Sequence, residues 1–254
     1  MGGTCTALIL TNQSAGKSLI YHNSVDPQVL AVIDLFRQSG CSIKVTDHQI
    51  EISRQDSVSH IRVITPVDRI VLANVALIAG MCKGSITVTG LRGTLIDKAT
   101  ATMLSEFGIV HEYERDSITF YSVDGLNPIN ATSKPFPGLS TDVLPLCAAT
   151  AACTYGKSKF TELIYPARTS HLSLLKEFGI ESSIMDKSYI IYGRPKCISA
   201  AKVKPTDIRA AAAALQLALI AKGTSVFFNS FHIFRGYENW FEKLRSLGAK
   251  IELL

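Results

Sequence analysis

The stretch MLSEFGIVH, residues 103–111, carries the pattern that decides the fold. An apolar helix-like run ends at Gly108, and a strand-like run begins directly after it. The same pattern returns as LFRQSGCSI at 35–43, LLKEFGIES at 174–182 and KLRSLGAKI at 243–251. Glycine just past a helix adopts a left-handed conformation without a Cβ penalty. The four stretches therefore predict four helices that each end at a glycine and lead into a strand.

A second set of glycines lies 23 to 25 residues before the first set, at Gly16, Gly84, Gly156 and Gly223. Successive members of each set are 67 to 72 residues apart. Each unit reads helix, strand, helix, strand, with a further short strand such as SYIIYG at 188–193. Units of this length exceed those of an ordinary solenoid. They predict an α/β fold assembled from repeated βαβαββ-like units around common cores.

The first unit is shorter than the others. Only 15 residues precede Gly16, so the strand that should come before the first helix is missing. We therefore expect residues 1–59 to form a partial unit, the tail of an N-terminal domain that is otherwise missing. Residues 60–254 are expected to form a complete three-unit domain.

Composition narrows the classes of function. The 254 residues are 47% hydrophobic with a net charge of +5, and no apolar run reaches the roughly 18 residues that span a bilayer. The N-terminus does not read as a signal peptide. The six cysteines are scattered without metal-ligand spacing, which is typical of reduced thiols in a cytoplasmic protein. We expect no nucleic acid, no membrane and no metal.

The stretch PFPGLSTD, residues 135–142, ends in a carboxylate just before an apolar run. Asp68 and Asp207 occupy similar places in their own units, and aspartate is a preferred helix N-cap. The repeat therefore favours a capping role for Asp142, with a substrate-facing carboxylate as the alternative. The same comparison places Cys41 in an apolar column and predicts a small core residue.

Several stretches resemble UDP-N-acetylglucosamine enolpyruvyl transferase, the 1-carboxyvinyltransferase family. The most specific is FHIFRGYENWFEKLRSLGAKIE at 231–252, and PTDIRA at 205–210, TELIYPARTSHLSLL at 161–175, VDRIVLANVALIAG at 67–80 and PFPGLSTD add to it. The related 5-enolpyruvylshikimate-3-phosphate synthase shares the repeat plan but lacks the Arg-Gly-Tyr-Glu and Pro-Gly-x-x-Thr-Asp pair, so it ranks lower.

The resemblance implies an inside-out α/β barrel, with helices inside and strands outside. Such an enzyme has six units in two domains, so this chain corresponds to its C-terminal portion. The implied reaction transfers the enolpyruvyl group of phosphoenolpyruvate to the 3-hydroxyl of UDP-N-acetylglucosamine and releases phosphate, the first committed step of peptidoglycan synthesis. No cofactor is implied.

The resemblance also implies roles for individual residues. Asp142 would contact the sugar 3-hydroxyl and act as the general base, so we expect both roles at once, with the N-terminus of a helix presenting this carboxylate. Arg235 would clamp phosphoenolpyruvate, and Arg168 and Arg209 would line the same pocket, unless they only form ion pairs. The backbone of Ile164 would contact the amino sugar, and Gly2 would belong to a loop that contacts uridine.

Other residues are expected to be structural. His171 is predicted to pack or cap, and Asp68 and Asp207 to cap their helices, with Arg69 and Arg209 as their partners. The family's loop cysteine, in a Gly-Gly-Cys context, has no counterpart among the six cysteines. We therefore expect half of an interdomain site, completed by a complementing N-terminal chain; the alternative is a non-catalytic binding module.

Overall fold

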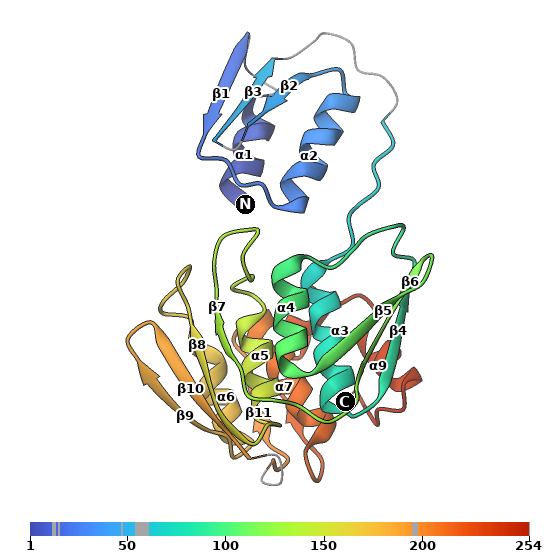
Figure 1. Cartoon of the computed structure of the whole chain (residues 1–254), viewed down its shortest axis with the longest axis vertical. Coiled ribbons are helices and arrows are strands. Elements are labelled where there is room, and N and C mark those ends of the chain that lie inside the picture. The colour runs from blue at the N-terminus through green and yellow to red at the C-terminus, as the bar shows by residue number, and fades with distance from the viewer. Residues whose placement is uncertain (12–13, 15, 47, 54–60, 195–197, 254) are drawn as a thin grey trace. The chain divides into compact units, whose positions relative to one another are not determined.

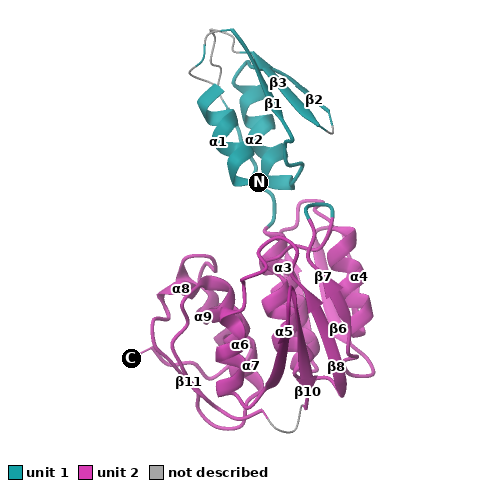
Figure 2. Cartoon of the chain, turned by 90° about the vertical axis from the view of Figure 1, so that its left-hand side faces the viewer, with its two compact units in different colours: residues 1–67, 135–137 teal, residues 68–134, 138–254 magenta. Residues whose placement is uncertain are grey.

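In a computed structural model of the chain, residues 1–11, 14, 16–46, 48–53, 61–194 and 198–253 are described. They form two compact units, one of residues 1–67 with 135–137 and one of residues 68–134 with 138–254 (Figure 2). The predicted boundary between residues 59 and 60 falls in a stretch outside the described residues, as does Cys197.

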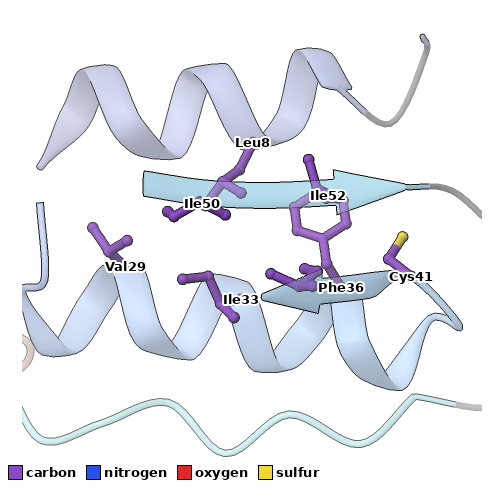
Figure 3. Close-up of a cluster of buried hydrophobic side chains, with 8 residues drawn as sticks. Leu8, Val29, Ile33, Phe36, Cys41, Ile50 and Ile52 are labelled. Carbon is purple, nitrogen blue, oxygen red and sulfur yellow. The ribbon is translucent and has the colours of Figure 1, made fainter. Parts of the chain in front are cut away.

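The first unit contains one set of repeat elements. These are α1 (Gly2–Thr11), β1 (Lys17–Tyr21), α2 (Pro27–Gln38), β2 (Ser42–Val45) and β3 (Gln49–Ser53). The strands pair antiparallel in the order β1-β3-β2. Figure 3 shows the two helices contributing Leu8, Val29 and Ile33 to a core that also holds Ile50 and Ile52 from β3.

Cys41 belongs to the same core, with an exposed fraction of 7%, which confirms its predicted role as a small core residue.

The second unit contains three further sets of elements (Figure 1). The first set is α3 (Arg69–Met81), β4 (Ser85–Thr89), α4 (Lys98–Phe107), β5 (Ile109–Tyr113) and β6 (Ser117–Ser122). The next is β7 (Asn130–Thr132), α5 (Leu144–Ala151), β8 (Gly156–Thr161), α6 (Ser170–Glu177), β9 (Glu181–Met185) and β10 (Ser188–Gly193). The last is β11 (Lys202–Val203), α7 (Ile208–Ile220), β12 (Val226–Phe227), α8 (Phe231–Phe234) and α9 (Trp240–Ser246).

Three of the four sheets share one strand order, whereas β11 and β12 form a two-stranded parallel pair, and this mixture of helices and strands confirms the predicted α/β class. Strands β4, β6 and β5 pair in the order β4-β6-β5, and the next sheet has the order β7-β8-β10-β9. In that sheet β7 and β8 are parallel, whereas β10 is antiparallel to both of its neighbours. This middle set realises the predicted βαβαββ order in full.

The first helix of each set in the second unit, α3, α5 or α7, is largely buried. All residues of α5 are buried, as are Ala210 to Leu217 of α7, and α3, α5 and α7 contact one another. A helix that is apolar on every side is stable only when it is covered on every side. Sheets cover two of these helices, because α3 contacts β6 and α5 contacts β8 and β10, whereas α7 packs against α5 and α6.

The repeated glycines take the predicted left-handed conformation at every site except Gly84. At that site the preceding Lys83 adopts the positive φ, of 52°. The strand predicted after Gly248 is also absent, because residues 249–253 form no strand. In the other sets this strand pairs with the strand that follows it, and residues 249–253 have no such partner among the described residues.

Candidate active site

Asp142 lies two residues before the first residue of α5 and does not cap the helix. Asp68 and Asp207 accept hydrogen bonds from the backbone N–H groups two and three residues ahead, and so cap α3 and α7 as predicted. The residue three positions after Asp142 is Pro145, which has no N–H group. The capping interpretation of Asp142 is therefore wrong, and its carboxylate is available for other contacts.

Two arginines meet the Asp142 carboxylate. Arg168 donates from Nη1 to Oδ1 over 2.7 Å, and Arg209 donates from Nε to the same oxygen. The side chains are partly covered, with exposed fractions of 31% for Asp142, 17% for Arg168 and 32% for Arg209. Two guanidinium groups around one carboxylate leave the cluster with a net positive charge, which favours an anionic ligand.

The helix cap at Asp207 fixes the backbone that carries Arg209. Its carboxylate accepts from the N–H groups of Arg209 and Ala210, at 2.9 and 3.0 Å, and from Ser170 Oγ at 2.7 Å. Burial raises the pKa of Asp207, but these hydrogen bonds outweigh it and the pKa lies below its ordinary value.

The Arg209 guanidinium, in contrast, pairs with Asp142 rather than with Asp207. The hydrogen bond to Asp142 raises the pKa of Arg209. The Arg69 guanidinium lies 3.9 Å from Asp97, and its pairing with Asp68 stays a prediction.

Arg168 is held from two further directions. Its Nη1 also donates to Thr141 Oγ1 over 2.7 Å, and its guanidinium lies 4.5 Å from the ring centroid of Tyr165. A guanidinium over an aromatic face is stabilised by the ring quadrupole. Among the described residues, no other partner holds the remaining N–H groups of Arg168, so they are free to meet a ligand.

Within the second unit, Ile164 and Arg235 lie outside this three-residue cluster. Ile164 is half-buried, and its N–H group donates to Glu162 Oε1 over 2.8 Å, so only its carbonyl remains for a ligand. Arg235 is exposed at the end of α8 and forms no ion pair within residues 198–253 or with the cluster. Gly2 is the first residue of α1, so the predicted loop at this position is wrong.

The segment that carries Arg235 approaches the cluster through Tyr237. Tyr237 is 5% exposed, and burial raises its pKa; the side chain of Asn74 and the charges of Asp142 and Arg209 act on the same hydroxyl. Residue Asn74 of α3 in turn accepts from Gln216 Nε2 of α7 over 2.8 Å. A buried polar chain therefore joins the inner helices to the residue two positions after Arg235.

The sequence analysis missed two residues of the site, Thr141 and Glu162. Thr141 bridges Arg168 and Glu162, whose side chain is 2% exposed. A signal existed, because Glu162 comes two residues after Phe160, on the same side of a predicted strand, and a carboxylate buried there needs specific partners.

His171 is buried against the Tyr189 ring, with centroids 5.0 Å apart, which confirms its packing role. Burial lowers the pKa of His171 to about 4, so the ring is neutral at pH 7.

Cys147 and Cys153, in α5 and just after it, are poor nucleophiles. Burial raises the pKa of Cys153 to about 12 and that of Cys147 further, which keeps both protonated. Among the described residues there is no group of three or more metal-ligating side chains, and no helix has both the length and the apolar character to cross a membrane.

Curated relatives match nearly the whole chain. UDP-N-acetylglucosamine 1-carboxyvinyltransferase of Prosthecochloris aestuarii is 29% identical over 253 residues, which cover 99% of this chain and 59% of the relative. UDP-N-acetylglucosamine 1-carboxyvinyltransferase 2 of Streptococcus mutans is 28% identical, with 100% and 60% covered. The chain thus spans about three-fifths of the length of these relatives.

Solved structures share the fold. The enolpyruvyl transferase NikO from Streptomyces tendae superposes with a TM-score of 0.86 at 24% identity, over 99% of this chain and 60% of NikO. EPSP synthase from Acinetobacter baumannii gives a TM-score of 0.77 at 16% identity, over 97% and 60% of the two chains. The family profile described as EPSP synthase (3-phosphoshikimate 1-carboxyvinyltransferase) matches residues 3–244. With this match over most of its length, the chain belongs to the EPSP synthase family of enolpyruvyl transferases.

Proposed function

We propose that the chain takes part in enolpyruvyl transfer from phosphoenolpyruvate to the 3-hydroxyl of UDP-N-acetylglucosamine, with release of phosphate. The observation that carries the proposal is the contact of the Asp142 carboxylate with Arg168 and Arg209. The names of the curated relatives favour UDP-N-acetylglucosamine over a shikimate substrate.

Phosphoenolpyruvate matches the charge of the cluster, since it carries a carboxylate and a phosphate. Guanidinium groups bind both kinds of anion through paired N–H donors. Arg168 and Arg209 would hold this substrate beside Asp142, and Arg235 would add a third cation from the segment after α8. Cations in these places also stabilise the charge on the departing phosphate.

Asp142 is suited to act as the general base. The 3-hydroxyl oxygen would bond to C2 of phosphoenolpyruvate while its proton passes to the Asp142 carboxylate. C3 takes up a proton from water in this addition and becomes a methyl group, giving a tetrahedral ketal. Elimination then returns a proton from C3 to water and breaks the bond between C2 and the phosphate oxygen, whose electron pair leaves with phosphate, so that the enol ether and phosphate are released.

The sugar nucleotide would be held by backbone groups. The Ile164 carbonyl is the atom that remains for the amino sugar, because Glu162 accepts the Ile164 N–H group. A uridine contact at Gly2 rests on the resemblance alone, and it would come from the start of a helix rather than from a loop.

The reaction is proposed for the chain in combination with a complementing N-terminal chain, because this chain covers only 59% of a full-length relative. We place this activity in peptidoglycan synthesis in the cytoplasm. The alternative is a binding module that keeps affinity for the sugar nucleotide without catalysis.

Phosphate release from phosphoenolpyruvate and UDP-N-acetylglucosamine tests the proposal. The full chain is assayed alone and with the N-terminal two-fifths of a curated relative, and calorimetry measures the binding of each substrate. Release in either assay supports the reaction. Binding of UDP-N-acetylglucosamine without release in both assays supports the binding module, and the absence of both contradicts both functions.

A further inference from the structure

Glu162 is a buried carboxylate that the proposed reaction does not use. It directly follows β8, and its side chain is 2% exposed. Carboxylates are almost never buried to this extent unless charges or hydrogen bonds compensate them. Among the described residues no lysine or arginine forms an ion pair with Glu162. Hydrogen bonds must therefore compensate its charge.

Four donors surround this carboxylate. Oε1 accepts from Ser133 Oγ at 2.6 Å, from Ile164 N at 2.8 Å and from Tyr165 N at 3.0 Å, and Oε2 accepts from Thr141 Oγ1 at 2.6 Å. The donors come from two segments, the loop before α5 and the turn after β8. The carboxylate of Glu162 therefore connects these two segments by accepting hydrogen bonds from both of them.

The directions of these hydrogen bonds follow from the neighbours of the two hydroxyl groups. Arg168 can only donate, so Thr141 Oγ1 accepts from it at 2.7 Å. The Leu163 N–H group can also only donate, and Ser133 Oγ accepts from it at 3.0 Å. Each hydroxyl has one proton, and both protons must therefore point at Glu162.

A neutral group does not fit this arrangement. Burial raises the pKa of Glu162, but the hydrogen bonds from Ser133, Thr141 and the backbone outweigh it and the pKa lies below its ordinary value. The anion accepts every donor around it, whereas an amide would place its own N–H groups against at least one of them.

We propose that Glu162 is a positioning residue of the candidate site, which holds Asp142 and Arg168 against each other through its contacts with Thr141 and with the turn after β8. Thr141 is adjacent to Asp142 in the chain and donates to Glu162, while its oxygen receives Arg168. The backbone of Ile164 and Tyr165, anchored on Oε1, begins the turn that presents Arg168. The effect on substrate rests on the proposed function, whereas the anchoring of the turn does not.

The test compares Glu162→Gln with Ser158→Ala in the full chain. Ser158 faces the same side of β8, is fully buried and accepts from Ile129 N, but it lies about 13 Å from Glu162 along the strand. Both variants weaken a buried hydrogen bond, so both should lower the unfolding midpoint. Only Glu162→Gln should alter the candidate site.

Two measurements separate positioning from stability. Amide exchange at Ile164 and Tyr165 should speed up about tenfold in Glu162→Gln, because a charged acceptor is replaced by a neutral one. The dissociation constant for phosphoenolpyruvate should rise about tenfold, because Arg168 is no longer held in place beside Asp142. Ser158→Ala should change neither quantity, and equal effects in the two variants would overturn the proposal.

Thr141→Val removes the hydrogen bond between Thr141 and Glu162 by deleting its donor. It should reproduce the loss of phosphoenolpyruvate affinity, and the double variant with Glu162→Gln should lose no more than the larger single effect. Unchanged affinity in Thr141→Val, or fully additive losses, would contradict the positioning role. If phosphoenolpyruvate binds neither to the wild-type chain nor to its mixture with the N-terminal chain, the proposed function fails, and amide exchange at Ile164 and Tyr165 still decides whether Glu162 anchors the turn.

Discussion

Asp142 and Arg209 are 67 residues apart in the chain, yet Arg209 Nε donates to Asp142 Oδ1. Asp142 lies before α5 and Arg209 in the first turn of α7, and these two helices pack directly against each other. The contact therefore depends on the packing of two successive repeats. One repeat supplies the Asp142 carboxylate and the next repeat supplies the Arg209 guanidinium, so neither repeat contains the site alone.

Asp142→Ala should lower the rate of phosphate release by at least about 100-fold, because a general base contributes about this factor to the rate. The rate is measured in whichever assay, with or without the N-terminal chain, shows release by the wild type. The unfolding free energy of the variant should change little, since Asp142 caps no helix and is 31% exposed. Enzyme kinetics and urea denaturation of the same preparation make the comparison.

Asp68→Ala is the matched control for this prediction. Asp68 caps α3 with two hydrogen bonds, so its loss should lower the unfolding free energy by about 1 kcal/mol and leave turnover within about twofold. A larger stability loss at Asp142 than at Asp68 would restore the capping interpretation.

The contrast between Asp142 and the two capping aspartates shows which features could be predicted from the sequence. The glycine repeat predicted the helices and their order, because a left-handed residue after a helix is a local requirement that few residues meet. It also placed Asp142 in the same class as Asp68 and Asp207, although Asp142 lies 14 rather than 16 residues before its glycine. That offset and Pro145 distinguish Asp142, and both are visible in the sequence.

The buried partners of the site were less accessible to prediction. The contacts of Glu162 with Ser133 and Thr141 span 29 and 21 residues, and they depend on how β8 lies beside the loop before α5. No local pattern encodes such a distance. The resemblance supplied Arg168 and Arg209, but pairing with the same carboxylate oxygen required the packed structure.

Arg209→Ala should raise the dissociation constant for phosphoenolpyruvate by at least about tenfold, because it removes one of two cations beside Asp142. Arg194→Ala removes the same charge from the pair with Glu181, whose side chains are 66% and 57% exposed. Exposed pairs contribute little, so this control should bind phosphoenolpyruvate like the wild type. Calorimetry on both variants measures the difference, and equal losses would show that only net charge matters.

The unfolding free energy should fall as the pH drops from 7 to 5, because His171 must stay neutral in the folded chain. Its pKa is about 4 when folded, below the ordinary value of 6.5, so the unfolded state binds the proton first as the pH falls. The stabilisation is complete above pH 6.5 and is lost progressively towards pH 4. At pH 5 the unfolding free energy should be lower than at pH 7 by about 2 kcal/mol.

His171→Phe should flatten this pH dependence and keep the stability at pH 7. Neither ring nitrogen has a hydrogen-bond partner among the residues that the structure describes, so replacing the imidazole with a phenyl ring breaks no hydrogen bond there. Urea denaturation at pH 7 and pH 5 gives the slope. His111→Phe, at a half-buried ring on β5, serves as the control and should keep the wild-type slope. A wild-type slope in His171→Phe would assign the pH dependence to the carboxylates instead.

Asn74→Leu should destabilise the second unit by about 1 to 3 kcal/mol, because it leaves the Gln216 amide buried without its partner. Asn74 Oδ1 accepts from Gln216 Nε2 at 2.8 Å, and both side chains are 1% exposed. Gln216→Leu should lower the unfolding free energy by a similar amount, because it leaves Asn74 Oδ1 buried without the donor from Gln216. The double variant should be more stable than the sum of the two losses predicts, since neither amide is then left buried against an apolar replacement of its partner. Urea unfolding of the four proteins closes the cycle. Additive losses would show that the hydrogen bond between α3 and α7 contributes no coupling, and that each amide acts through its own packing.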